Sequence, residues 1–156
     1  MVKMIYHAGM VVKDLEKSLK WYTEVLGLKI ERPIRELTGE WISQVTGYEN
    51  TKLRMVWVGT DGDCSIELNQ YMEPPGLVEA IKRQRNDVGA THIGLEVDSV
   101  HEWYNRLSKL GVTFAAPPPP PLENIKYPWA RCAVYMQDPD GNWLELLERD
   151  PPPEKI

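Results

Sequence analysis

The 156-residue chain has few cysteines, no long basic run and no long apolar stretch. A formal net charge of −5 without a cationic cluster argues against binding to nucleic acid, which needs a basic surface. No apolar run approaches the roughly 18 residues of a membrane-spanning helix, so no membrane partner is expected. The first residues lead directly into an apolar strand pattern, and no signal peptide is predicted.

The only two cysteines, Cys64 and Cys132, are not spaced as metal ligands. Both fall in predicted strands, where free cysteines are usually buried thiols. We therefore expect no disulfide, and a cytoplasmic location.

What the sequence does contain is an internal repeat. His7 and His92 are each followed by a glycine two residues later and a valine five residues later, and each opens an apolar strand pattern. A helix-capping residue and an amphipathic helix that ends in Leu-Gly come next in both halves. The chain thus consists of two copies of one unit, and each copy begins with a histidine on a strand.

The predicted elements follow this repeat. Strands are expected at residues 4–12, 28–36, 52–58, 64–71, 91–97, 112–115, 130–137 and 143–148, and helices at 15–26, 40–46 and 100–110. They form a first βαβββ module (1–72), a linker (73–89) with a helical turn at 77–85, a second βαβββ module (90–149) and a Pro-rich tail (150–156).

The second module also contains five consecutive prolines at 117–121, which cannot join a strand ladder. The prolines begin a long loop. This loop either covers a pocket, with Trp129 lining it, or is a rigid surface spacer.

A carboxylate stands between apolar neighbours in the last strand of each module, at Glu67 and Glu145. An unpaired buried carboxylate costs several kcal/mol, roughly, and a metal ion removes that cost. Together with His7 and His92, the two glutamates make an N2O2 set that suits one divalent ion of Zn, Co, Ni, Mn or Fe. A lone strand histidine is more often structural than a ligand, so the hypothesis depends on the repetition. His101 lies outside the pattern and is expected on the surface.

The sequence resembles the vicinal oxygen chelate superfamily, which includes glyoxalase I, methylmalonyl-CoA epimerase, extradiol dioxygenases and bleomycin-resistance proteins. The resemblance is carried by HAGMVVKDLEKSLKWYTEVLGLK from residue 7, SIEL from 65, THIGLEVDSV from 91 and DPDGNWLELLE from 138. It implies an α+β fold in which two tandem βαβββ modules curl into an open mixed barrel around one metal. The implied ligands are His7, Glu67, His92 and Glu145.

The resemblance also indicates which branches of the superfamily the sequence favours. A full ligand set argues against a metal-free binding protein, and a fourth ligand, Glu67, favours Lewis-acid chemistry over an Fe(II) dioxygenase. Val11 and Tyr71 stand where bacterial glyoxalase I has the arginine and asparagine that bind glutathione. The spacing from Glu67 to His92 is like that of the epimerases.

We therefore expect a metal-dependent isomerase or epimerase that removes a proton next to a metal-bound carbonyl, with an acyl-CoA as one candidate substrate. Glu145 is the expected catalytic base, and Glu36 or Glu40 the second acid. The alternatives are a lactoylglutathione lyase, an Fe(II) ring-cleavage dioxygenase and a metal-free small-molecule binder. The resemblance implies a homodimer, and the site could lie within one chain or be shared across the dimer.

Overall fold

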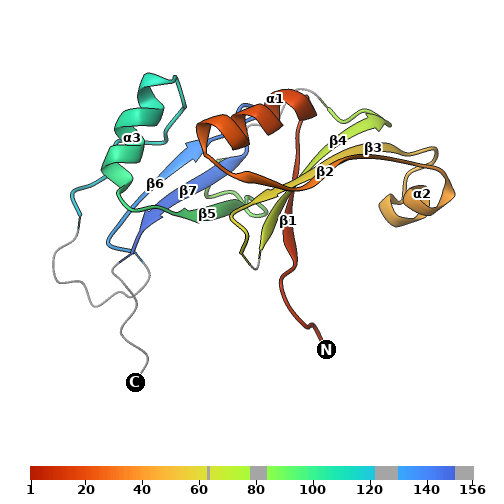
Figure 1. Cartoon of the computed structure of the whole chain (residues 1–156), viewed down its shortest axis with the longest axis horizontal. Helices are drawn as coiled ribbons and strands as arrows, with labels where there is room; N and C mark the ends of the chain where they lie inside the picture. The colour runs from red at the N-terminus through yellow and green to blue at the C-terminus, as the bar shows by residue number, and fades with distance from the viewer. Residues whose placement is uncertain (63, 78–83, 122–129, 150–156) are drawn as a thin grey trace. The chain divides into compact units, whose positions relative to one another are not determined.

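A computed structural model describes residues 1–62, 64–77, 84–121 and 130–149 (Figure 1). The chain divides into two compact units, residues 1–81 and 82–156. The finer module boundaries at 72 and 90 stay a prediction. Most of the predicted turn at 77–85, Trp129 and the tail at 150–156 lie outside the described residues.

Unit 1 is a four-stranded mixed sheet with two helical segments. Its elements are β1 (His7–Val11), α1 (Leu15–Lys20) continued by the π-helical η1 (Trp21–Val25), β2 (Lys29–Thr38), α2 (Glu40–Thr46), β3 (Lys52–Gly59) and β4 (Ser65–Glu73). The strand order is β1-β4-β3-β2, with β1 parallel to β4 and the other pairs antiparallel. In Figure 1, α1 lies over the sheet and α2 projects at the end of the β2–β3 hairpin.

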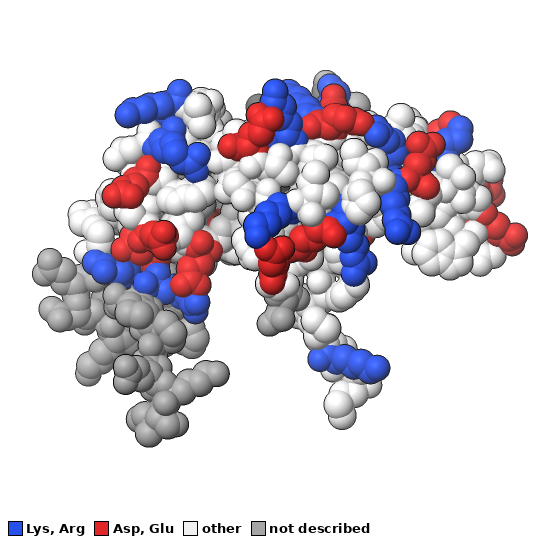
Figure 2. Space-filling view, in the orientation of Figure 1, with Lys and Arg blue, Asp and Glu red and all other residues white. Residues whose placement is uncertain are grey.

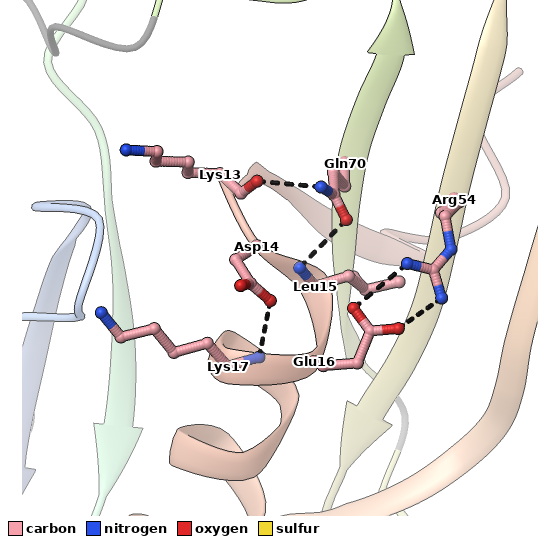
Figure 3. A network of polar contacts seen from close by, with 7 residues as sticks. All are labelled: Lys13, Asp14, Leu15, Glu16, Lys17, Arg54 and Gln70. Carbon is pink, nitrogen blue, oxygen red and sulfur yellow. Dashed lines mark hydrogen bonds and ion pairs between the residues drawn. The ribbon is translucent and has the colours of Figure 1, made fainter.

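The start of α1 is attached to the sheet by polar side chains (Figure 3). Asp14 caps the helix by accepting a hydrogen bond from the Lys17 N–H at 3.0 Å, as N-cap carboxylates commonly do. From β4, Gln70 accepts from the Leu15 N–H at 3.1 Å and donates to the Lys13 carbonyl at 2.9 Å. From β3, Arg54 forms a two-pronged ion pair with Glu16. These contacts determine where the chain leaves β1, and therefore help to hold the histidine strand in register.

Unit 2 repeats the plan with a smaller sheet. It contains β5 (His92–Glu96), α3 (Val100–Lys109), β6 (Cys132–Gln137) and β7 (Trp143–Glu148). The strand order is β5-β7-β6, with β5 parallel to β7 and β6 antiparallel to it. Ser99 caps α3 through the Glu102 N–H, and α3 packs against β6 and β7. The predicted fold class is confirmed: the protein is a mixed α+β fold with two open sheets.

Each sheet buries one face, and the apolar side chains of the strands supply its core. In unit 1 the fully buried residues include Leu15, Tyr22, Val56, Val58 and Leu68; in unit 2 they are Val100, Leu107, Met136, Leu144 and Leu146. Because side chains alternate along a strand, Glu67 and Glu145 lie on the opposite face from the buried leucines beside them.

Several predicted elements need correction. The first strand begins at His7, not residue 4, and the exposed residues 4–6 lie outside it. The strand predicted at 112–115 is reduced to one bridge between Phe114 and Met136, because the prolines from 117 onward lack the N–H groups that would extend the ladder. Cys64 is exposed and precedes β4, whereas Cys132 is buried in β6 as predicted, and both are free.

Charged side chains of both signs are interspersed on the face shown in Figure 2. Charged residues of the chain form ion pairs, such as Lys52 with Glu73 and Arg131 with Glu148. No helix in the described part of the chain is both long and apolar enough to cross a membrane.

Candidate metal centre

In unit 1, two neighbouring parallel strands bring His7 and Glu67 together. Gly9 of β1 is the register partner of Glu67 in β4, and His7 precedes Gly9 by two residues, so it points to the same face. His7 Nε2 lies 3.5 Å from Glu67 Oε2. The Glu67 side chain is only 13% exposed and that of His7 is 35% exposed. The pair is therefore half-buried yet open to solvent on the imidazole side.

Unit 2 builds the same pair from the same register. Gly94 of β5 is opposite Glu145 of β7, and His92 precedes Gly94 by two residues. His92 Nε2 lies 3.3 Å from Glu145 Oε2, and the side chains are 45% and 21% exposed. The sequence repeat thus corresponds to a repeated arrangement of imidazole and carboxylate.

The glycines keep the space beside each carboxylate free. A Cβ atom at Gly9 would lie 3.6 Å from Glu67 Oε2 and 3.7 Å from Asn69 Nδ2. At Gly94 it would come within 3.1 Å of Leu147 Cδ2 and 3.9 Å of Glu145 Oε2. A side chain at either position would therefore contact the carboxylate oxygen of the glutamate on the neighbouring strand.

The separations within the pairs fit two ligands of one metal ion. Nitrogen and oxygen ligands about 2.1 Å from a tetrahedral or octahedral ion lie about 3.0–3.4 Å apart. The observed 3.5 and 3.3 Å are close to this range and longer than the usual 2.7–2.9 Å, roughly, of a charge-assisted hydrogen bond. The donor chemistry of the two pairs therefore suits a divalent ion.

Each pair lies within one unit. Over residues 1–62, 64–77, 84–121 and 130–149, no group of three or more His, Cys, Asp or Glu side chains is gathered as a metal site. The structure thus places two of the four predicted ligands together in unit 1 and the other two together in unit 2. The convergence of all four on one ion stays a prediction.

Two aromatic residues beside the glutamates were missed by the sequence analysis. Trp57 of β3 is the register partner of Glu67 and donates its indole N–H to Oε1 at 3.0 Å. Tyr135 of β6 is the register partner of Glu145, so its side chain lies on the same face of the sheet as that carboxylate. The signal was present in the sequence, because each aromatic residue stands at the same distance before its glutamate.

The aromatic rings also contact the histidines. Trp57 lies 4.7 Å from the His7 ring, and Tyr135 lies edge-on at 5.0 Å from the His92 ring, centroid to centroid. Burial raises the pKa of Tyr135, and the neighbouring negative charge of Glu145 raises it further. The tyrosine therefore stays a protonated donor at neutral pH.

The two sites differ two residues after each glutamate. Asn69 donates from Nδ2 to Glu67 Oε2 at 2.8 Å, so both oxygens of Glu67 accept from a protein N–H. Asn69 is buried, and its Oδ1 has no hydrogen-bond partner in the described structure. The matching position after Glu145 is Leu147, which offers no donor. Glu67 is thus held more firmly than Glu145.

The remaining predicted residues lie apart from these contacts. Glu36 and Glu40 are exposed, and no contact in the described structure joins either to a His–Glu pair. Glu40 begins α2 and lines a surface pocket of about 490 Å³ with Thr38, Ser43 and Lys52. His101, predicted at the surface, lies at the start of α3 with Nε2 3.0 Å from the Pro119 carbonyl.

Several known proteins are similar to this chain in sequence or in fold. The chain is 27% identical over 154 residues to the uncharacterized protein YwbC of Bacillus subtilis, covering 96% of this chain and 100% of that protein. It is 28% identical over its whole length to a probable chloroplastic lactoylglutathione lyase of Arabidopsis thaliana, but spans only 37% of that protein. Among solved structures, a glyoxalase family protein from Bacillus cereus superposes with a TM-score of 0.76 at 24% identity, covering 96% of this chain and 95% of the other.

The family assignment follows from the match over most of the chain. The sequence model of one superfamily matches residues 4–146, which include both His–Glu pairs. The chain belongs to the Glyoxalase/Bleomycin resistance protein/Dioxygenase superfamily.

Proposed function

We propose that this protein is a divalent-metal-dependent isomerase or epimerase that moves a proton next to a substrate carbonyl. The observation that carries the proposal is the repeated His–Glu pair, present in both units with the same register and at separations suited to metal ligands. A metal-free binding protein would have no need to keep two such pairs half-buried.

His7, Glu67, His92 and Glu145 would hold the ion, from one chain or from two chains of a homodimer. A divalent ion held by these residues would act as a Lewis acid that polarises the substrate carbonyl and makes the adjacent proton easier to remove. The two units would contribute equally to binding the ion, because each supplies one nitrogen and one oxygen ligand.

The difference between the two glutamates favours Glu145 as the base. Both oxygens of Glu67 accept N–H hydrogen bonds, from Trp57 and Asn69, which orient the carboxylate, use one lone pair of each oxygen and leave the others for the ion. In the described structure no N–H group donates to Glu145, whose strand partner is Tyr135 and which is followed two residues later by Leu147. A general base needs a free lone pair that can reach the substrate proton. Glu145 would therefore remove the proton, while Glu67 would only help to hold the ion.

The substrate would be a small carbonyl compound, with an acyl-CoA as one candidate. Returning the proton to the opposite face requires a second acid. Glu36 and Glu40 were the candidates from the sequence, and their lack of contact with either pair gives them no support. The hydroxyl of Tyr135, beside Glu145 and the His92 ring, is better placed to orient the base than either of them.

The test is solvent deuterium exchange into a panel of acyl-CoA substrates by protein loaded with Zn, Co, Ni, Mn or Fe in turn. We expect exchange that a chelator abolishes and one of the metals restores. With saturating metal, Glu145→Gln should lower the exchange rate at least 100-fold, whereas Glu67→Gln should weaken metal binding and retain most of the rate. Near wild-type exchange by Glu145→Gln would show that the base is assigned wrongly.

A lactoylglutathione lyase is the second candidate, favoured by the relative from Arabidopsis thaliana that carries this name. Val11 and Tyr71 give it less support, since neither side chain can pair with a glutathione carboxylate as arginine would. The hemithioacetal of methylglyoxal and glutathione, added to the substrate panel, distinguishes the two activities. Turnover of this compound with no exchange into any acyl-CoA would favour the lyase.

A further inference from the structure

A row of four register partners crosses the whole sheet of unit 1. Gly9 in β1 pairs with Glu67 in β4, Glu67 pairs with Trp57 in β3, and Trp57 pairs with Arg32 in β2. Side chains of directly opposed residues point to the same face of a sheet. Arg32 therefore shares a face with the His7–Glu67 pair, two strand spacings or about 10 Å away along the sheet.

Two aromatic rings hold the guanidinium of Arg32 in place. Its Cζ lies 4.1 Å from the ring centroid of Trp57 and 5.3 Å from that of Tyr6. One of its terminal nitrogens donates to the Tyr6 hydroxyl. A guanidinium that stacks on a ring keeps its in-plane N–H groups available to an anion. The two rings thus fix the position of the Arg32 guanidinium and leave N–H groups of it accessible to a ligand.

The charge of Arg32 is also not neutralised. Lys29, Lys52 and Arg54 of the same unit each pair with a carboxylate. In the described part of the chain, no carboxylate pairs with Arg32, whose partners are Trp57 and Tyr6. An oriented arginine whose charge has no carboxylate partner in the described structure is suited to binding a carboxylate or phosphate of a ligand.

We propose that Arg32 binds an anionic group of the substrate, a carboxylate or a phosphate, and so selects acidic carbonyl compounds. The role in substrate selection rests on the proposed function, whereas anion binding by Arg32 does not. Trp57 connects Arg32 to the His7–Glu67 pair, because its indole ring stacks against the Arg32 guanidinium and its N–H donates to Glu67.

The first experiment measures anion binding directly. The protein, stripped of metal with chelator and labelled with 15N-arginine, is titrated with malonate and separately with inorganic phosphate, and the Nε–Hε resonance of Arg32 is followed by NMR. We expect saturable shifts that weaken as NaCl is raised. The tighter of the two anions identifies whether a carboxylate or a phosphate is the preferred group. No saturable shift with either anion overturns the proposal.

Variants separate anion binding from a purely structural stack. Arg32→Gln should weaken binding of the preferred anion, measured by calorimetry, at least 10-fold. Arg32→Lys should have an intermediate effect, because lysine keeps the positive charge but lacks the planar, two-pronged hydrogen-bond geometry of the guanidinium. Arg35→Gln is the matched control, since Arg35 is exposed on the same strand, and it should change the affinity less than twofold. Equal losses in Arg32→Gln and Arg35→Gln would mean non-specific attraction. Far-UV circular dichroism and thermal unfolding confirm that each variant is folded.

The second experiment tests selection in the metal-loaded protein. For an acidic substrate found by deuterium exchange, Arg32→Gln should raise KM about 10-fold with little change in kcat. The reason is that Arg32 would bind the anionic group equally in the ground state and in the transition state. For the methyl ester of the same compound it should change neither. If anion binding is absent while exchange proceeds, the inference about Arg32 fails alone. If Arg32 binds anions but no substrate exchanges, the proposed function fails alone.

Discussion

The indole N–H of Trp57 donates to Glu67 Oε1 at 3.0 Å across two paired strands. The same register position in unit 2, opposite Glu145, is held by Tyr135. A carboxylate ligand is usually oriented by such hydrogen-bond donors, whose loss costs about 10–100-fold in metal affinity. The two aromatic residues are therefore part of the candidate centre, although neither is a metal ligand.

Trp57→Phe removes the donor to Glu67 and keeps a ring of similar shape. We expect metal affinity to fall about 10-fold, because the carboxylate loses its orientation. The measurement is a competition titration with a chromophoric chelator. Trp41→Phe, on the exposed face of α2, is the control and should leave the affinity unchanged. Equal affinity in wild type and Trp57→Phe would mean that this hydrogen bond does not support a metal ligand.

Asn69→Leu makes unit 1 resemble unit 2, where Leu147 follows Glu145 by two residues. The substitution removes both the donor to Glu67 and a buried oxygen without a partner. Leaving a buried acceptor unpaired costs about 1–3 kcal/mol, so the variant should be at least as stable as the wild type in urea unfolding. Its metal affinity should nevertheless fall severalfold. A loss of stability together with unchanged metal binding would contradict this reading of Asn69.

Tyr135→Phe removes the hydroxyl beside Glu145 and keeps the ring against His92. With saturating metal, deuterium exchange should slow about 10-fold, because the base loses the polar hydroxyl beside it. Tyr104→Phe is the control, since that ring packs against Phe114 on the helix side of unit 2. A rate equal to that of the wild type would remove Tyr135 from the proposed site.

The ion pair between Glu16 and Arg54 makes stability depend on pH. The hydrogen bond from Arg54 lowers the pKa of Glu16 below its ordinary value. A carboxylate whose pKa is lower in the folded state stabilises the fold above the unfolded pKa, and this contribution is lost as pH falls through the folded pKa. Because Glu16 is largely exposed, Glu16→Gln should lower the free energy of unfolding by under about 1 kcal/mol at neutral pH and should not change it in strong acid. Urea unfolding at several pH values measures this, with Glu24→Gln on the same helical segment as the control.

The two cysteines should differ in reactivity. Cys64 is exposed, whereas burial raises the pKa of the Cys132 thiol, which lies in β6. The thiolate is the reactive form, so iodoacetamide should modify Cys64 in the native protein and reach Cys132 only after unfolding. Mass spectrometry of tryptic peptides measures both rates. Rapid native labelling of Cys132 would mean that β6 opens easily.

Sequence periodicity was most informative where turn or capping residues lie at both ends of a strand or helix. The helix at Glu40–Thr46 and the strand at Trp143–Glu148 have the predicted bounds, because local turn residues set their ends. The predicted strand at 112–115 failed because a strand also needs a partner along its length, and the prolines after it provide no N–H groups. The prediction that Cys64 lies in a strand was wrong, because apolar neighbours indicate burial only for a residue that is itself paired into the sheet.

The sequence by itself determined the family, the repeat and the four candidate ligands, because these depend on residue types at matching positions. The tertiary structure decided which groups surround them. Trp57, Tyr135 and Arg32 are distant in sequence from the histidines, and only the pairing of β2, β3 and β6 with their neighbours places their side chains on the same faces. Strand register is a long-range property that sequence alternation restricts but does not specify, so only the folded chain decided which of the repeated aromatic residues lie beside the glutamates.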